Sequence, residues 1–130
     1  MKWLTLCAVV LLFACVPSVA QTTHEYTGLD LLNRCQPLTR TPLSLSSNER
    51  EEAGYCMGYL LGMKDMLTTW NVVDEHDKIK GRSTMCVPYE ATTAELVRVV
   101  VKFLNDHPTK LHEYMGGVVI SAFRDAYPCK

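Results

Sequence analysis

The sequence has 130 residues, with 13 Lys and Arg against 14 Asp and Glu, so that its net charge is −1. A nearly neutral chain has neither the basic field expected of a nucleic-acid-binding protein nor an acidic interaction tail, and we expect no nucleic-acid partner. Its length suffices for one small domain with a hydrophobic core.

The N-terminus has the features of a secretory signal peptide. Lys2 supplies a positive start, residues 4–16 form an apolar run, and residues 18–20 place small side chains before a cleavage point at Gln21. The apolar run is short for a membrane anchor. We therefore expect export to the periplasm and no membrane attachment after cleavage.

Lipid anchoring is the alternative fate of this N-terminus. Cys15 lies in a sequence that resembles a lipoprotein cleavage site, but a phenylalanine two positions before it is unusual there. We favour simple cleavage, which predicts a signal peptide, residues 1–20, and a single domain, residues 21–130. Only one charged residue is lost with the signal, so the remaining chain has a net charge of −2.

The first predicted helix is short. Thr27 followed by Asp30 has the spacing of a capping box, and the helix is expected to end near Cys35 because Pro37 disfavours its continuation. A connector rich in Pro, Ser and Thr follows over residues 37–46.

The central predicted helix begins at a second capping box, Ser46 with Glu49, and is expected to end near Trp70. Residues 71–85 then lose apolar periodicity and become charged. This pattern predicts a long loop, and loops of this length in a compact domain are usually functional or mobile.

Three glycines recur every fourth residue in the central helix: Gly54, Gly58 and Gly62. Each one destabilises a helix interior by about 0.5–1 kcal/mol relative to alanine. We therefore expect the row to pack closely against a neighbouring helix, so that a bulky residue at Gly58 destabilises the fold. Pairing inside a membrane is the alternative, but Lys64 and Asp65 within the segment disfavour it.

The C-terminal half predicts two further helices. Thr92 with Glu95 is a third capping box, and it favours a helix over residues 96–104, although three consecutive valines there would also suit a buried strand. A tight turn and a last helix over residues 115–126 follow. The expected fold class is all-α, a small bundle of about four helices linked by two disulfides.

The predicted domain has four cysteines, Cys35, Cys56, Cys86 and Cys129, and an even number in an exported protein predicts two disulfides. A zinc site is the competing interpretation, but no C-x-x-C pair occurs. We favour Cys56–Cys86 with Cys35–Cys129, because the predicted loop is long enough to return Cys86 to the central helix. Cys35–Cys56 with Cys86–Cys129, and Cys35–Cys86 with Cys56–Cys129, stay open.

Sequence signatures of enzymes are missing, including those of serine hydrolases, P-loop proteins, dinucleotide-binding enzymes and zinc proteases. The histidines are scattered, and His107 is expected to cap a helix end. Paired cysteines offer no nucleophile. We therefore predict a binding protein that is not an enzyme and has no catalytic residue, metal ion or cofactor.

Four blocks of sequence, in order, are residues 54–65 (GYCMGYLLGMKD), 86–88 (CVP), 96–108 (LVRVVVKFLNDHP) and 126–129 (AYPC). Together they resemble the Rap/Tai family of type VI secretion immunity proteins. The resemblance implies a small helical periplasmic protein, commonly a homodimer, that binds a secreted effector, notably a peptidoglycan amidase. The family often has Phe where this chain has Tyr127.

An immunity protein acts by tight occlusion of its toxin, to which a rigid scaffold and a variable loop are suited. The predicted loop has no family pattern, so the identity of the toxin stays open. Its expected toxin contacts are Val72, Val73, Asp74, Glu75, His76 and Asp77. Two other classes also stay open: a periplasmic acid-stress chaperone of the HdeA kind, and an enzyme or ligand carrier with a polar pocket.

Overall fold

The computed structural model describes residues 26–40, 45–77 and 85–129, with the side chains of all of these except residues 71–77. The described α-helices are α2 (Gly28–Cys35), α3 (Ser47–Asp77), α4 (Thr93–Asp106) and α5 (Met115–Ala126). Two short 3-10 helices are η1 (Gln36–Thr39), after α2, and η3 (Pro108–His112), after α4. The predicted all-α fold class is confirmed.

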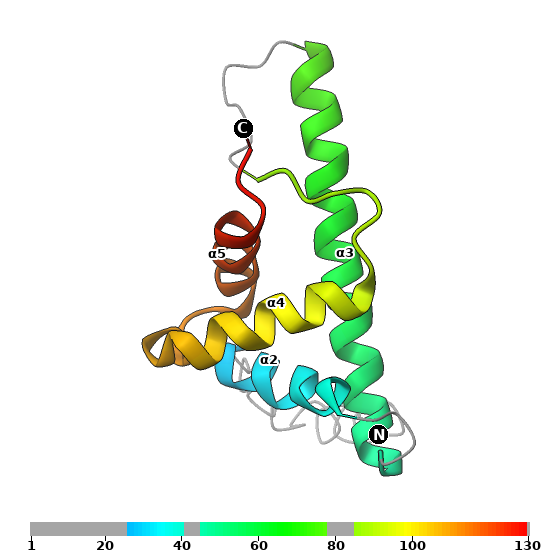
Figure 1. Cartoon of the computed structure of the whole chain (residues 1–130), viewed down its shortest axis with the longest axis vertical. Helices are drawn as coiled ribbons and strands as arrows, with labels where there is room; N and C mark the ends of the chain where they lie inside the picture. The colour runs from blue at the N-terminus through cyan, green and yellow to red at the C-terminus, as the bar shows by residue number, and fades with distance from the viewer. Residues whose placement is uncertain (1–25, 41–44, 78–84, 130) are drawn as a thin grey trace, which may run out of the picture.

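The longest helix, α3, extends along the whole length of the molecule in Figure 1. The helices α2 and α4 cross its lower half, and α5 lies on the far side of α4 from α2. With 31 residues and a rise of 1.5 Å per residue, α3 is about 46 Å long. Its C-terminal turns therefore extend beyond the other three helices.

All three predicted capping boxes form. The Glu95 backbone N–H donates to the Thr92 hydroxyl at 3.3 Å, and the Glu95 carboxylate accepts the Thr92 backbone N–H at 2.7 Å. That backbone hydrogen bond lowers the pKa of Glu95. The cap therefore stabilises α4 at neutral pH and is lost as the pH falls through the lowered pKa. Equivalent pairs form between Thr27 and Asp30 and between Ser46 and Glu49.

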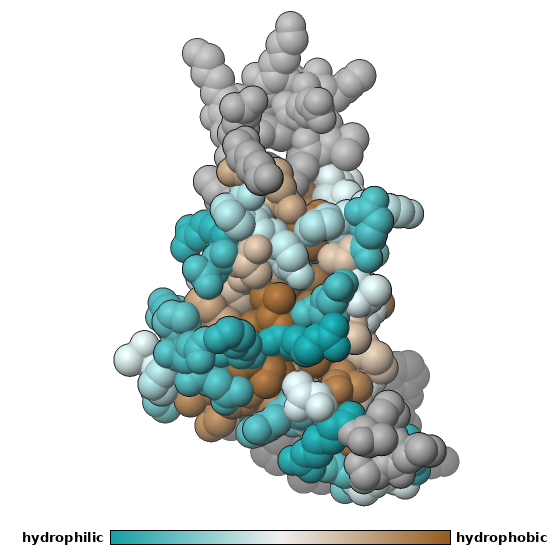
Figure 2. Space-filling model, in the orientation of Figure 1, coloured by the Kyte–Doolittle hydropathy of each residue, from teal (hydrophilic) through white to brown (hydrophobic). Residues whose placement is uncertain are grey.

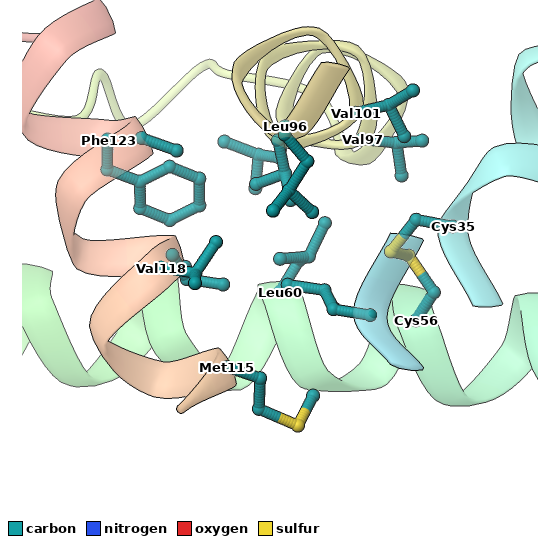
Figure 3. Close-up of a cluster of buried hydrophobic side chains, with 14 of the residues drawn as sticks. Cys35, Cys56, Leu60, Leu96, Val97, Val101, Met115, Val118 and Phe123 are labelled. Carbon is teal, nitrogen blue, oxygen red and sulfur yellow. A yellow bond between two sulfur atoms is a disulfide. The ribbon is translucent and has the colours of Figure 1, made fainter. Parts of the chain in front are cut away.

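The hydrophobic core lies where α2, α4 and α5 meet one side of α3. Figure 3 shows Leu60 of α3 facing Val118 and Phe123 of α5, with Leu96 of α4 beside them. These four side chains are fully buried. The outer side of the molecule at α4 is covered by hydrophilic side chains, with hydrophobic atoms visible between them (Figure 2). Residues 96–104 lie within α4, so the prediction of a helix rather than a strand is confirmed.

The disulfides pair Cys35 with Cys56 and Cys86 with Cys129. The favoured pairing, Cys56–Cys86 with Cys35–Cys129, is wrong. Cys56 lies on the side of α3 that α2 covers, which places its Cα 5.3 Å from that of Cys35 at the end of α2. Cys86 instead lies beside the C-terminal residues, with its Cα 4.9 Å from that of Cys129.

The end of α3 also differs from the prediction. The helix continues past Trp70 to Asp77, since no glycine or proline occurs in residues 71–77 to break it. The expected toxin contacts lie on the last two turns of this helix rather than in a loop, and their side chains lie outside the described part: Val72, Val73, Asp74, Glu75, His76 and Asp77. The predicted signal peptide, residues 1–20, also lies outside the described residues.

Candidate interaction surfaces

The glycine row of α3 faces away from the other described helices. Gly54, Gly58 and Gly62 are exposed, and a Cβ atom added at any of them would meet no neighbouring atom within 4 Å. The expected packing of this row inside the fold is wrong, because Cys56 and Leu60 occupy the core-facing side of α3. The glycines therefore weaken α3 without a compensating contact in the described chain.

Large apolar side chains flank these glycines. At helical spacing Met57 and Leu61 lie on one side of the row, and Tyr55 and Met66 lie on the other. Each of the four is between 37% and 50% exposed. Contiguous apolar surface of this kind is typical of protein–protein contact. We define the glycine face by seven residues: Gly54, Tyr55, Met57, Gly58, Leu61, Gly62 and Met66.

Aromatic rings extend the glycine face towards α2. The rings of Tyr26, Tyr55 and Tyr59 stack in succession, with centroids 6.2 Å apart in each pair. The Arg34 guanidinium lies 4.3 Å from the centroid of the Tyr55 ring, and its Nη1 lies 2.6 Å from the Glu52 carboxylate. These contacts link α2 to α3. Tyrosine and arginine are also enriched among residues that dominate binding energy at interfaces.

A second surface is formed by residues 85–92, which we name the strap. It runs across α3 from the C-terminal residues to the start of α4 (Figure 1). Met85 and Val87 are partly buried against the core, whereas Cys86 and Pro88 are exposed. This alternation gives the strap one face on the core and one face in solvent.

The first end of the strap is held to the end of the chain. The disulfide joins Cys86 to Cys129, and the Cys86 backbone N–H donates to the Tyr127 carbonyl at 2.8 Å. Further along, a turn closes by a hydrogen bond of 3.1 Å from the Ala91 backbone N–H to the Pro88 carbonyl. The backbone of the strap is therefore restrained on both sides of its turn.

Lys64 of α3 holds the second end of the strap. Only 9% of this residue is exposed, and its Nζ donates to the carbonyls of Tyr89 at 2.6 Å and of Ala91 at 2.9 Å. The same Nζ lies 5.7 Å from the centroid of the Tyr89 ring. With its backbone held in this way, Tyr89 has a side chain available to a partner, since the residue is 81% exposed.

Replacing Lys64 by methionine is expected to lower the free energy of unfolding by about 1–3 kcal/mol, because two strap carbonyls lose a charged donor. Hydrogen exchange should accelerate at the Ala91 amide. The matched control is Lys102→Met on the exposed side of α4, where a change within about 0.5 kcal/mol is expected. Equal effects of the two substitutions in urea denaturation would contradict this role of Lys64.

The strap and α3 border a polar hollow with a volume of about 560 Å³, lined by Lys64, Asp65, Thr68, Thr69 and Tyr89. Thr69 is one helical turn before the first of the expected toxin contacts, residues 72–77. The C-terminal turns of α3 therefore begin next to the strap and continue beyond it (Figure 1).

Metal-binding groups, His107 and the length of the helices are the remaining features of the described part of the chain that bear on the sequence predictions. No three His, Cys, Asp or Glu residues within it are placed to hold a metal ion. His107 caps the end of α4, as predicted, with its Nδ1 2.8 Å from the Phe103 carbonyl oxygen and its ring stacked on the Phe103 ring. None of the described helices has the length and apolar character needed to cross a membrane.

A family model described as Rap1a immunity proteins matches residues 27–129, a span that includes all four described α-helices and both disulfides. The chain belongs to the Rap1a immunity protein family. The resemblance to Rap/Tai immunity proteins is thereby confirmed, and membership implies a role in toxin immunity. Comparison with curated proteins and with solved structures found no match.

Two residues of this Rap1a immunity protein that shape the strap were missed by sequence reasoning, Lys64 and Tyr89. A signal for Lys64 exists, since Cys56, Leu60 and Lys64 recur every four residues and the first two face the core. A lysine in such a row has to find oxygen acceptors. No comparable pattern marks Tyr89, whose exposure depends on the path of the strap.

Proposed function

We propose that this Rap1a immunity protein binds and occludes a peptidoglycan amidase delivered by type VI secretion, and that it acts in the periplasm without turnover of its own. The observation that carries the proposal is the family match over residues 27–129. The two disulfides suit an oxidising compartment, and cleavage of the predicted signal peptide would release the protein there.

The strap and the C-terminal turns of α3 are the proposed contact with the toxin. Binding is less costly when the contacting backbone is already ordered, and the strap is held by the Cys86–Cys129 disulfide and by Lys64. The exposed ring of Tyr89 is suited to entering a cleft. Residues 72–77 continue this surface along α3 and remain the proposed specificity residues.

The test titrates oxidised protein, residues 21–130, into purified secreted peptidoglycan amidases, beginning with any that is encoded beside its gene. We expect stoichiometric inhibition of one amidase and protection of cells that direct this amidase to the periplasm. Failure to inhibit or bind any amidase would contradict the proposal. Loss of a dimer near pH 2–3 with capture of unfolded clients would instead support the HdeA-like chaperone function.

Within that complex, Tyr89→Ala is expected to weaken binding by about 2 kcal/mol, or roughly 30-fold in Kd, as for a residue that dominates an interface. Tyr114→Ala is the matched control, because Tyr114 is 68% exposed at the start of α5, outside the strap. Isothermal titration calorimetry measures both. Equal affinities of the two variants would place the toxin elsewhere.

We also propose a homodimer in which a second copy packs on the glycine face. The resemblance to Rap/Tai proteins implies a homodimer without indicating its interface, and an exposed row of glycines lets two helices approach closely when each supplies apolar side chains. Leu61 and Met57 of each copy would lie over the glycines of the other. The contact would offset the helix-weakening effect of three glycines.

Gly58→Leu tests this interface. We expect a monomer in light scattering after size-exclusion chromatography, with no loss of helical content, because a Cβ atom added at Gly58 has open space around it and leucine is a better helix former than glycine. Gly117→Leu is the control, since Gly117 is equally unobstructed but lies on α5. A dimer that persists in Gly58→Leu would exclude the glycine face as the interface.

A further inference from the structure

The two disulfides lie in different surroundings. Cys35 and Cys56 are 0% exposed and belong to the hydrophobic core, between α2 and α3 (Figure 3). Cys86 is exposed and Cys129 is half-buried, and neither belongs to the core. Because thiol–disulfide exchange needs access of a thiolate to sulfur, a reductant can reach the second bond far more readily than the first.

The bonds also hold different parts of the molecule. Cys35–Cys56 joins two core helices that Arg34 and Glu52 link as well. Cys86–Cys129 joins the strap to the end of the chain. Further restraints there are the hydrogen bond from the Cys86 amide to the Tyr127 carbonyl, the bridge between Met85 and Pro128, and the packing of Met85, Val87 and Tyr127 against the core. Opening the second bond therefore leaves the contacts among the four helices in place.

The second end of the strap does not depend on the disulfide. Lys64 continues to bind the carbonyls of Tyr89 and Ala91 after the bond opens, because those hydrogen bonds come from α3. Reduction removes the covalent restraint on residues 85–88 and 127–129, which are then held by noncovalent contacts alone and are expected to open more often, while residues 89–92 stay near α3. The turn that presents Tyr89 is then still held by Lys64, but the chain before it is no longer held by a disulfide.

We propose that Cys86–Cys129 is a redox switch: a dithiol reductant opens it selectively, while Cys35–Cys56 stays closed, and the strap takes its binding shape only in the oxidised state. One thiolate of the dithiol attacks a sulfur of the Cys86–Cys129 pair, and the other sulfur leaves as a thiolate that takes up a proton. The second thiol of the reductant then resolves the mixed disulfide. The protein gains two electrons and two protons, and the dithiol becomes a disulfide.

The consequence for immunity rests on the proposed function of the strap. An oxidised copy that meets a dithiol reductant keeps its helices but binds toxin weakly. Immunity is thereby tied to the redox state of the compartment in which a cell-wall-degrading toxin acts. The switch itself is independent of the toxin and can be measured without it.

The first experiment titrates the oxidised protein with dithiothreitol at pH 8, traps free thiols by alkylation and identifies them by peptide mass spectrometry. We expect Cys86 and Cys129 to become labelled at least about tenfold faster than Cys35 and Cys56. Hydrogen exchange of the partly reduced protein should increase in residues 85–88 and 127–129, with protection in α5 unchanged. Parallel labelling of all four cysteines, or an unchanged rate at the Cys86 amide, would overturn the proposal.

The double variant Cys86→Ser/Cys129→Ser mimics the reduced state, and Lys64→Met in the same background removes the second restraint. The double variant should retain its circular dichroism spectrum and exchange fast only at residues 85–88 and 127–129, whereas the triple variant should also exchange fast at Ala91. If the double variant unfolds globally and the wild type also unfolds on selective reduction, the Cys86–Cys129 bond is required for the fold, and the proposal of a switch is wrong.

The toxin measurement separates the two proposals. If an amidase binds the oxidised protein, selective reduction should raise its Kd at least about tenfold, which reoxidation reverses. An unchanged Kd would show that reduction of Cys86–Cys129 does not regulate toxin binding, and the proposed function would be unaffected. If no amidase binds the oxidised protein, the proposed function fails, and the labelling and exchange results still decide the selective opening of Cys86–Cys129.

Discussion

Replacing Phe123 by alanine is expected to lower the free energy of unfolding by about 3–5 kcal/mol. Phe123 is 0% exposed in the centre of the core, with its ring beside Val118 and Leu96 (Figure 3). Its removal loses apolar burial and leaves a cavity that helices joined by a disulfide cannot readily close. A domain of this size has a total free energy of unfolding of about 5–15 kcal/mol, so the Tm of the variant should be many degrees lower than that of the wild type.

The control for Phe123→Ala is Trp70→Ala on α3. Trp70 is larger but 62% exposed, so its removal from a protein without bound partner should change the stability by about 0.5 kcal/mol or less. Urea denaturation monitored by circular dichroism measures both variants. Comparable losses would mean that the core is not centred on α5.

The second large effect is expected for the double variant Cys35→Ala/Cys56→Ala. These cysteines are 21 positions apart, and releasing a loop of that length destabilises the folded state by about 3 kcal/mol in the chain-entropy model. Loss of two buried sulfur atoms from the core adds to this. Hydrogen-exchange protection should fall first in α2, whose attachment to α3 depends on the bond.

The other bond provides the comparison. Cys86 and Cys129 are 43 residues apart, for which the same model gives about 4 kcal/mol. The two double variants are therefore distinguished by where protection is lost rather than by total stability. Loss of protection in α2 after removal of Cys86–Cys129, with the strap unaffected, would contradict the assignment of the two bonds.

The candidate surfaces were only partly predictable. The sequence predicts that residues 72–77 contact a toxin, but it does not predict that they are helical. Residues 71–77 lack the apolar periodicity that indicates a helix. The strap was not predicted as a surface at all. Its shape arises from Lys64, which is 25 residues from Tyr89 along the chain, and such distant contacts leave no local pattern.

The glycine row shows the same division within one helix. The recurrence of Gly54, Gly58 and Gly62 correctly indicates a shared side of α3, since the period of an α-helix is fixed by its backbone. The direction in which this side points is set by where α2 and α4 cross α3. Burial of Cys56 and Leu60 on the opposite side left the glycines exposed.

The amino-acid sequence by itself determined the all-α fold class, the starts of α2, α3 and α4, and the presence of two disulfides. Capping boxes such as Thr92 with Glu95 join residues three positions apart, and an apolar stripe follows from helical geometry, so neither needs knowledge of the rest of the chain. Only the tertiary structure decided which cysteines pair, because each bond requires two Cα atoms within about 7 Å. That proximity depends on how the helices cross, and here the crossing of α2 over α3 brought Cys35 to Cys56 and left Cys86 for Cys129.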